Sequence, residues 1–193
     1  MISKMSNTKY SREIYLDSTK LGKVDILKKK KMLLIIAGVG GHEAQATILR
    51  GKLNLFSESL SVEMIIEAAS LNLHEDAHRI LSSSYLTKKQ SKLRFFPLLC
   101  VLVINIIQIC MVVQKKKNNF DIALVTLGPF PAIPGYIASK ISRLKFVSIE
   151  SRSRFESLSA TNRLLLKMGA TVVVQHNNAE SRSSNLKRLG VLM

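Results

Sequence analysis

The sequence predicts an α/β fold with a Rossmann-like parallel sheet, and two observations support this. Five short apolar stretches have the composition of strands, and helical patterns separate them, which is the βαβ alternation of a parallel sheet. The first stretch, residues 32–38 ("MLLIIAG"), is apolar throughout, as a strand covered on both faces should be. The chain has 193 residues, enough for one such domain but too few for two ordinary ones.

The other elements follow in order along the chain. A helix is predicted at 42–56, with Glu43 in its first turn, where a carboxylate complements the helix dipole. A further helix is predicted from about 72 to 82, and another at 159–169, where a hydroxyl or Asn caps the start and Gly169 is the stop signal. The remaining strands are predicted at 60–69, 121–128, 145–151 and 171–175.

Composition narrows the kind of protein. The formal charge of +16 indicates a phosphate-rich partner, either nucleic acid or an anionic membrane surface, and 47% hydrophobic residues argue against a disordered basic chain. Aromatic residues are only 6%, and the basic residues flank apolar segments, so we expect no nucleic-acid partner. Cys100 and Cys110 lie in one apolar segment and form no disulfide framework, which favours a reducing compartment.

Two regions stand apart from the predicted sheet. Residues 1–31 are polar and lysine-rich, without the apolar segment of a signal peptide, and we interpret them as a basic flexible lead-in to a domain at 32–193. Residues 95–113 are almost wholly apolar and long enough to span a bilayer. A crossing would put strands of one parallel sheet in two compartments. We therefore expect a helix lying in one leaflet, held by its basic flanks, or alternatively a buried core helix.

Polar clusters follow four of the predicted strands. In open parallel sheets ligands bind beyond the carboxyl ends of the strands, so these clusters mark the candidate site. The first, "AGVGGHEAQ", contains Gly38, Gly40 and Gly41, which let the backbone approach a phosphate or sugar at a helix N-terminus. His42 is a candidate general base or ligand-positioning donor, or else a capping residue without chemistry. Glu150 ends the fourth strand at the same predicted edge.

A resemblance to a known family extends over residues 32–193. "VSIESRSRFESLSATNRLL" is similar to the V-x-V-E-S-x-x-R-V-E-T-L-S motif of the membrane-recruiting subunit of the UDP-N-acetylglucosamine transferase of dolichol-linked oligosaccharide synthesis. Related bacterial exopolysaccharide glycosyltransferase subunits share this motif. "GVGGH" resembles the family's G-S-G-G-H, which is also found in the peptidoglycan lipid-linked N-acetylglucosaminyltransferase, and "RLGVLM" resembles the family's C-terminal tail.

The resemblance implies one half of a GT-B glycosyltransferase, the acceptor-side domain. Activity is then expected only in a complex with a soluble subunit that binds the nucleotide sugar. The acceptor would be a polyisoprenoid diphosphate sugar at the cytoplasmic face of a membrane: the endoplasmic reticulum in a eukaryote, the plasma membrane in a prokaryote. The product would serve N-glycan precursor or polysaccharide synthesis.

The same resemblance assigns roles to residues. Glu150 would orient or deprotonate the acceptor hydroxyl, or alternatively pair with Arg154 in a structural role. His42 would face the acceptor diphosphate together with the backbone N–H groups of Gly40 and Gly41. The C-terminal tail would insert into the partner subunit. The implied substrate-binding residues are Gly38, Gly40, Gly41, Gly128, Pro134, Ser151 and Arg154, and the implied partner-binding residues are Leu189, Gly190, Val191, Leu192 and Met193.

One loop departs from the family pattern. In "GPFPAIPG", Gly128 and Pro134 match, but Phe130 and Pro131 replace a glycine and a threonine. Both replacements narrow the expected loop, and Pro131 removes an N–H donor.

One further motif has the spacing of a metal site. "HEDAH", residues 74–78, matches the H-E-x-x-H zinc pattern, but a third ligand is missing and the stretch is short and polar, so we expect no metal. No cofactor is expected either. The alternative to the heteromeric transferase is a stand-alone nucleotide-sugar enzyme or binding protein that uses the same crevice.

Overall fold

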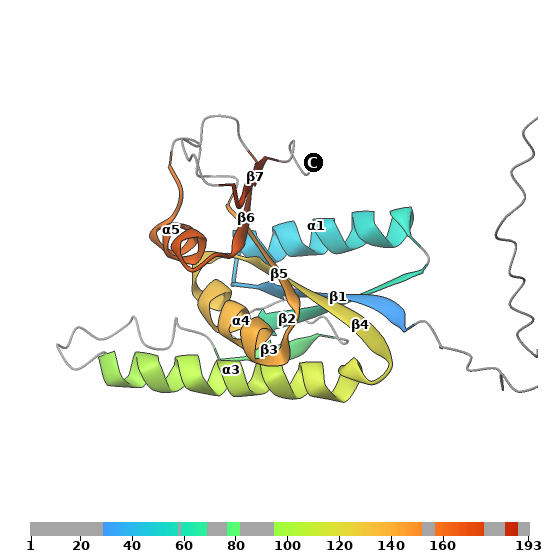
Figure 1. Ribbon diagram of the computed structural model, residues 1–193, viewed down its shortest axis with the longest axis horizontal. Helices are drawn as coiled ribbons and strands as arrows, with labels where there is room; N and C mark the ends of the chain where they lie inside the picture. Colours follow the sequence, from blue (N-terminus) through green and yellow to red (C-terminus); the bar gives the residue numbers. More distant parts are fainter. Residues whose placement is uncertain are drawn as a thin grey trace, which may run out of the picture.

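The computed structural model describes residues 29–57, 59–68, 77–81, 95–151, 157–175 and 184–188. Within these residues, seven strands form one parallel sheet in the order β3-β2-β1-β4-β5-β6-β7 (Figure 1). The strands are β1 (Lys30–Ala37), β2 (Leu60–Glu67), β3 (His78–Ile80), β4 (Phe120–Leu127), β5 (Lys145–Ile149), β6 (Thr171–Val174) and β7 (Leu186–Arg188).

Helices cover both faces of the sheet. One face is covered by α1 (Gly41–Phe56), and the other by α3 (Phe95–Lys117) and α4 (Pro129–Ser142), with α5 (Ala160–Lys167) packed beside α4 (Figure 1). Alternate residues of β1 serve the two faces: Ile35 and Ala37 pack under α1, whereas Leu34 and Ile36 pack under α3 and α4. This double coverage explains why β1 is apolar from Met32 to Ala37, beyond its two exposed lysines.

Two glycines start the helices nearest the centre of the sheet. Gly40, which precedes α1, has φ 73°, and Gly128, which precedes α4, has φ 102°. Residues with a Cβ rarely adopt this part of backbone space, so glycine is required at both positions for the backbone to turn sharply from strand into helix. Both turns lie at the carboxyl ends of adjacent strands.

The apolar segment forms α3, a helix of 23 residues and roughly 35 Å that packs along the sheet. Asn105 is fully buried on its inner face and pairs with the backbone of Leu81: its Oδ1 accepts from the Leu81 N–H at 2.9 Å, and its Nδ2 donates to the Leu81 carbonyl at 3.0 Å. The strands before and after α3, β3 and β4, belong to the same sheet, as expected for a helix that does not cross a membrane.

Several predicted elements need correction. The prediction of a helix at 72–82 is wrong over residues 78–80, which form the strand β3 and pair with β2. His78, the second histidine of "HEDAH", therefore lies on a strand. The short strand β7 was not predicted. The "GPFPAIPG" stretch is the start of α4 and not a loop, because Pro129 and Pro131 fall in the first turn, where helical N–H groups have no partner anyway. The first strand begins at Lys30, two residues before the predicted domain boundary, and residues 1–28 lie outside the described residues.

The contact between α4 and the sheet generates the first prediction. A Cβ on Gly135 would lie 2.8 Å from Thr126 Cγ2 and 3.1 Å from Ile36 Cδ1, so Gly135→Ala should lower the free energy of unfolding by about 1–3 kcal/mol. Gly51, in α1, has open space around its Cα, and Gly51→Ala should raise the same quantity by about 0.5–1 kcal/mol. Chemical denaturation followed by circular dichroism measures both. Equal effects of the two substitutions would contradict the close packing of α4.

Candidate functional site

The candidate site lies where β1 and β4 end. From β1 the chain passes through α1 to β2 on one side, and from β3 it returns through α3 on the opposite face to β4 on the other side of β1. Crossovers that leave a pair of strands in opposite directions open a crevice at their carboxyl ends, which is the usual ligand site of such sheets. The Gly38 N–H donates to the Leu127 carbonyl at 3.0 Å, which holds the two strand ends together.

His42 covers this junction from the first turn of α1. A Cβ on Gly128 would lie 3.0 Å from the His42 ring atoms Cδ2 and Cγ, and a Cβ on Gly38 would lie 3.8 Å from Cδ2. The imidazole therefore packs against backbone that has no side chain in its way. The N-termini of α1 and α4 meet at the same place. The first-turn N–H groups of α1 favour an anion there, whereas α4 adds only that of Phe130 among its first three residues, because Pro129 and Pro131 have no N–H.

The surroundings of His42 favour its neutral form. Burial lowers the pKa of the imidazole below its usual 6.5, and the negative charge of Glu150 opposes this by raising it. Among the described residues, its buried Nδ1 has no hydrogen-bond partner. A neutral, half-buried imidazole with an unpaired nitrogen can accept a proton or bind a ligand group.

Glu150 is buried and its carboxylate is held by three donors. Oε1 accepts from the Ser151 N–H at 3.0 Å, and Oε2 accepts from the Ser159 N–H at 2.7 Å and from Asn162 Nδ2 at 3.0 Å. Ser159 is the N-cap of α5 and accepts from the Asn162 N–H at 3.2 Å. This arrangement ties the end of β5 to the start of α5. It gives Glu150 a positioning role, with its charge available to the His42 imidazole.

The structure brings together most of the predicted site residues. Gly38, Gly40, Gly41, His42 and Gly128 meet at the β1–β4 junction, and Ser151 follows Glu150 at the end of the neighbouring β5. Pro134 is buried in the second turn of α4, one turn beyond this junction. Arg154 and residues 189–193 lie outside the described residues, so their predicted roles in substrate and partner binding stay predictions.

Three further polar residues were missed. Glu67 is buried at the end of β2, and its Oε1 would lie 3.4 Å from a Cβ on Gly38. Its signal in the sequence was the same as for Glu150, a carboxylate that ends an apolar strand. Gln175 donates from Nε2 to the Glu150 carbonyl at 3.1 Å, and Asn162 bridges Glu150 and the Ser148 hydroxyl. The last two are ordinary cap and turn residues in sequence, and only the fold reveals their partners.

Comparison with solved structures finds MurG of Acinetobacter baumannii, with a TM-score of 0.58 and 15% sequence identity. The match covers 83% of this chain and 45% of that chain, so this chain spans less than half of that protein's length. No protein-family model and no curated protein matches the sequence. The predicted fold class is confirmed in its architecture: a Rossmann-like parallel α/β sheet, which this chain shares with part of MurG.

The Glu150 contacts generate the second prediction. Glu150→Ala removes three hydrogen bonds and leaves buried donors of Ser159 and Asn162 unpaired, so it should lower the free energy of unfolding by about 2–4 kcal/mol. Gln175→Ala is the control, since it removes a single neutral hydrogen bond and should cost about 1 kcal/mol. Denaturant titration measures both variants, and an unchanged stability of Glu150→Ala would refute the positioning role.

Proposed function

We propose that this chain is the acceptor-side half of a heteromeric glycosyltransferase that adds N-acetylglucosamine from its UDP donor to a lipid-diphosphate sugar. The observation that carries the proposal is the extent of the fold match: most of this chain corresponds to just under half of MurG. A GT-B cleft lies between two such halves. A chain that supplies one half therefore needs a second polypeptide to hold the nucleotide sugar.

The site chemistry supports the acceptor side of such a cleft. The N-terminus of α1 binds the acceptor diphosphate through backbone N–H groups, and α4 adds the Phe130 N–H, because Pro129 and Pro131 have none to donate. His42, kept neutral by burial, takes the proton from the acceptor hydroxyl as that oxygen attacks C1 of the sugar and UDP leaves. The Glu150 charge stabilises the imidazolium that forms, since this carboxylate raises the pKa of His42.

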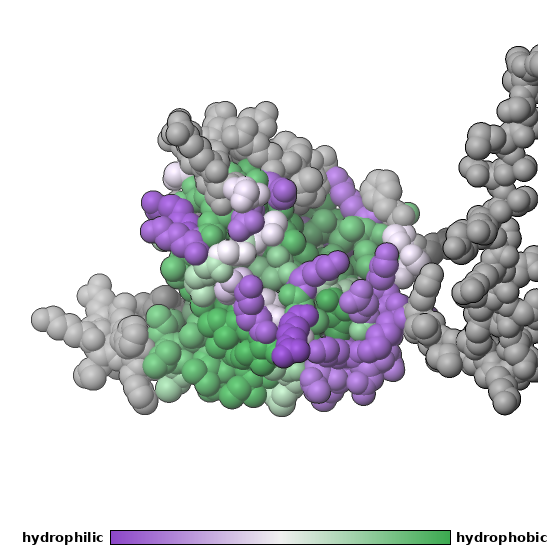
Figure 2. All heavy atoms as spheres, in the orientation of Figure 1, coloured by the Kyte–Doolittle hydropathy of each residue, from purple (hydrophilic) through white to green (hydrophobic). Residues whose placement is uncertain are grey.

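Membrane contact through α3 completes the proposal. Pro97–Lys117 is long and apolar enough to cross a bilayer, and only 17% of its most apolar stretch is buried. Its exposed side chains include Leu99, Val103, Ile107 and Met111. Figure 2 shows a continuous green, hydrophobic surface over α3 at the bottom of the molecule. Because the inner face of α3 packs on the sheet, this outer face suits a helix lying in one leaflet, with the site edge close to the acceptor lipid.

The proposal is tested by assaying sugar transfer with and without a partner. Material co-purified from membranes with the tagged chain should transfer N-acetylglucosamine from its UDP donor to a short-chain polyprenyl diphosphate acceptor. The chain purified alone, in detergent, should give no turnover until the co-purified polypeptide is added back. Turnover by the chain alone would favour the stand-alone enzyme, and none in either sample would contradict the proposal.

His42 is tested in the reconstituted complex. His42→Gln keeps a polar side chain but loses the base, so kcat should fall by about 100-fold or more. In the wild type, kcat should be level above pH 6.5 and fall as the pH drops through the lowered pKa of His42, because the imidazolium cannot accept a proton. A His42→Gln variant that keeps this pH profile and rate would show that another group is the base.

A further inference from the structure

A second cavity lies at the opposite edge of the sheet from the candidate site. It has a volume of about 620 Å³ and lies where β1, β2 and β4 begin. Three consecutive lysines, Lys29, Lys30 and Lys31, line it together with two hydroxyls, Ser59 and Ser61, and two apolar side chains, Leu60 and Phe120. Ammonium groups beside hydroxyl donors are the chemistry that binds a phosphate group.

Among the described residues, no carboxylate forms an ion pair with the lysines of this cavity. Lys29 donates from Nζ to the Lys117 carbonyl at 2.8 Å, and within the described chain the ammonium groups of Lys30 and Lys31 have no hydrogen-bond or ion-pair partner. Asp121, on β4, is the cross-strand neighbour of Lys31. Glu63 is already paired with Lys116, whose Nζ lies 2.5 Å from Glu63 Oε1. The last turn of α3 adds Lys115 at the same edge. Positive charge is thus in excess around the cavity.

An apolar groove adjoins the cavity. It runs between α3 and α4, has a volume of about 410 Å³, and is lined by Ile107, Met111 and Ile141 before it reaches Lys117. Ile141 is 64% exposed, although it is a large apolar side chain. The hydrogen bond from Lys29, which lines the cavity, to the carbonyl of Lys117, which lines the groove, places the two hollows next to each other. Figure 2 shows the same transition, from the green surface of α3 to the purple surface over its carboxyl-terminal end.

We propose that the cavity lined by Lys29–Lys31 binds the phosphate headgroup of an anionic membrane lipid, with the lipid tail against the groove between α3 and α4. A soluble phosphate would use the lysines and hydroxyls but leave the adjoining apolar surface uncovered, whereas a lipid covers both. The site is separate from the acceptor site, because it lies at the amino ends of strands whose carboxyl ends form the β1–β4 junction. It would orient the chain, so that the acceptor edge faces along the membrane.

This inference rests on the membrane contact of α3 proposed above, but not on sugar transfer. Phosphatidylcholine vesicles with and without phosphatidic acid test it in a flotation assay with the full chain. Wild type should bind the phosphatidic acid vesicles much more tightly. Lys30→Gln combined with Lys31→Gln should weaken that binding by about 30-fold, since each lysine near an anionic surface contributes about fivefold. Both side chains are exposed, so the fold should tolerate the change.

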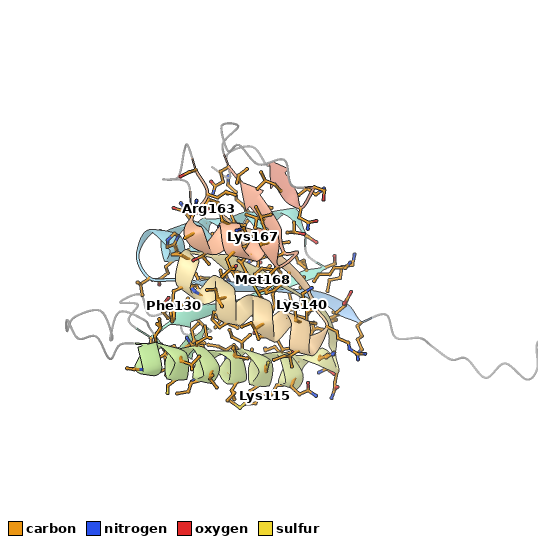
Figure 3. The ribbon with its side chains drawn as sticks, turned by 60° about the vertical axis from the view of Figure 1, so that its left-hand side comes forward. Lys115, Phe130, Lys140, Arg163, Lys167 and Met168 are labelled. Carbon is orange, nitrogen blue, oxygen red and sulfur yellow. The ribbon has the colours of Figure 1, made fainter. Side chains whose placement is uncertain are left out.

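The matched control is Arg163→Gln with Lys167→Gln, which removes the same charge from α5, away from α3 and its Lys115 (Figure 3). The control should stay within twofold of wild type. A second variant, Ser59→Asp, adds a carboxylate to the cavity without touching the lysines and should also weaken binding.

Any of the following results would overturn the proposed lipid-headgroup site. Equal loss in the cavity and control variants would mean nonspecific attraction to the surface. Competition by millimolar glycerol 3-phosphate, with saturable binding in the absence of vesicles, would identify a soluble phosphate ligand. Equal binding to vesicles with and without phosphatidic acid would exclude a headgroup site while leaving the α3 contact intact. Failure to bind any vesicle would contradict both, and the transfer assay would still decide the proposed function.

Discussion

The pairing of β1 with β4 is the constraint on which the site depends. Their parallel register runs from Lys30 opposite Phe120 to Ala37 opposite Leu127, and it continues into the hydrogen bond between Gly38 and the Leu127 carbonyl. Because both strands stop at the same level, the N-termini of α1 and α4 start side by side. The imidazole of His42 can then lie on Gly128, where any side chain would displace it. Slipping this pair by one residue would separate the helix starts and exchange the two faces of each strand.

The apolar helix α3 meets two different environments along its length. Two kinds of contact hold its inner face against the sheet. Asn105 completes the hydrogen bonding of the Leu81 backbone at the edge of the sheet, and Ile109 and Val113 are fully buried. Its outer face carries apolar side chains at 40–52% exposure, a large hydrophobic surface for a water-soluble domain. A helix buried in the core would not expose apolar side chains in this way, and a transmembrane helix outside any domain would not hydrogen-bond to the edge of a sheet. This combination supports the proposed contact of α3 with a membrane surface.

Much of this arrangement is encoded locally and was predictable. The apolar runs of β1, β2, β4, β5 and β6 and the glycines before α1 indicate a parallel sheet with its site at the strand ends. The predictions that were wrong have physical reasons. β3 is a strand of only three residues, and the helical spacing of apolar residues around it was a stronger signal than its own strand pattern. The prolines of α4 suggested a loop, although two of them fall in the first turn, where proline is tolerated. Two of the three donors around Glu150 come from the N-cap and first turn of α5, so sequence could place the carboxylate but not these partners.

The most direct test of the account is hydrogen–deuterium exchange of the full chain with and without a short-chain polyprenyl diphosphate sugar in detergent. If the β1–β4 junction binds the acceptor diphosphate, amides at the start of α1, from Gly40 to Ala44, and the amide of Gly128 should exchange more slowly with the ligand. The amides of Ser59 and Ser61, at the opposite edge, should not change. Protection confined to the opposite edge, or the absence of any protection at the helix starts, would contradict the account.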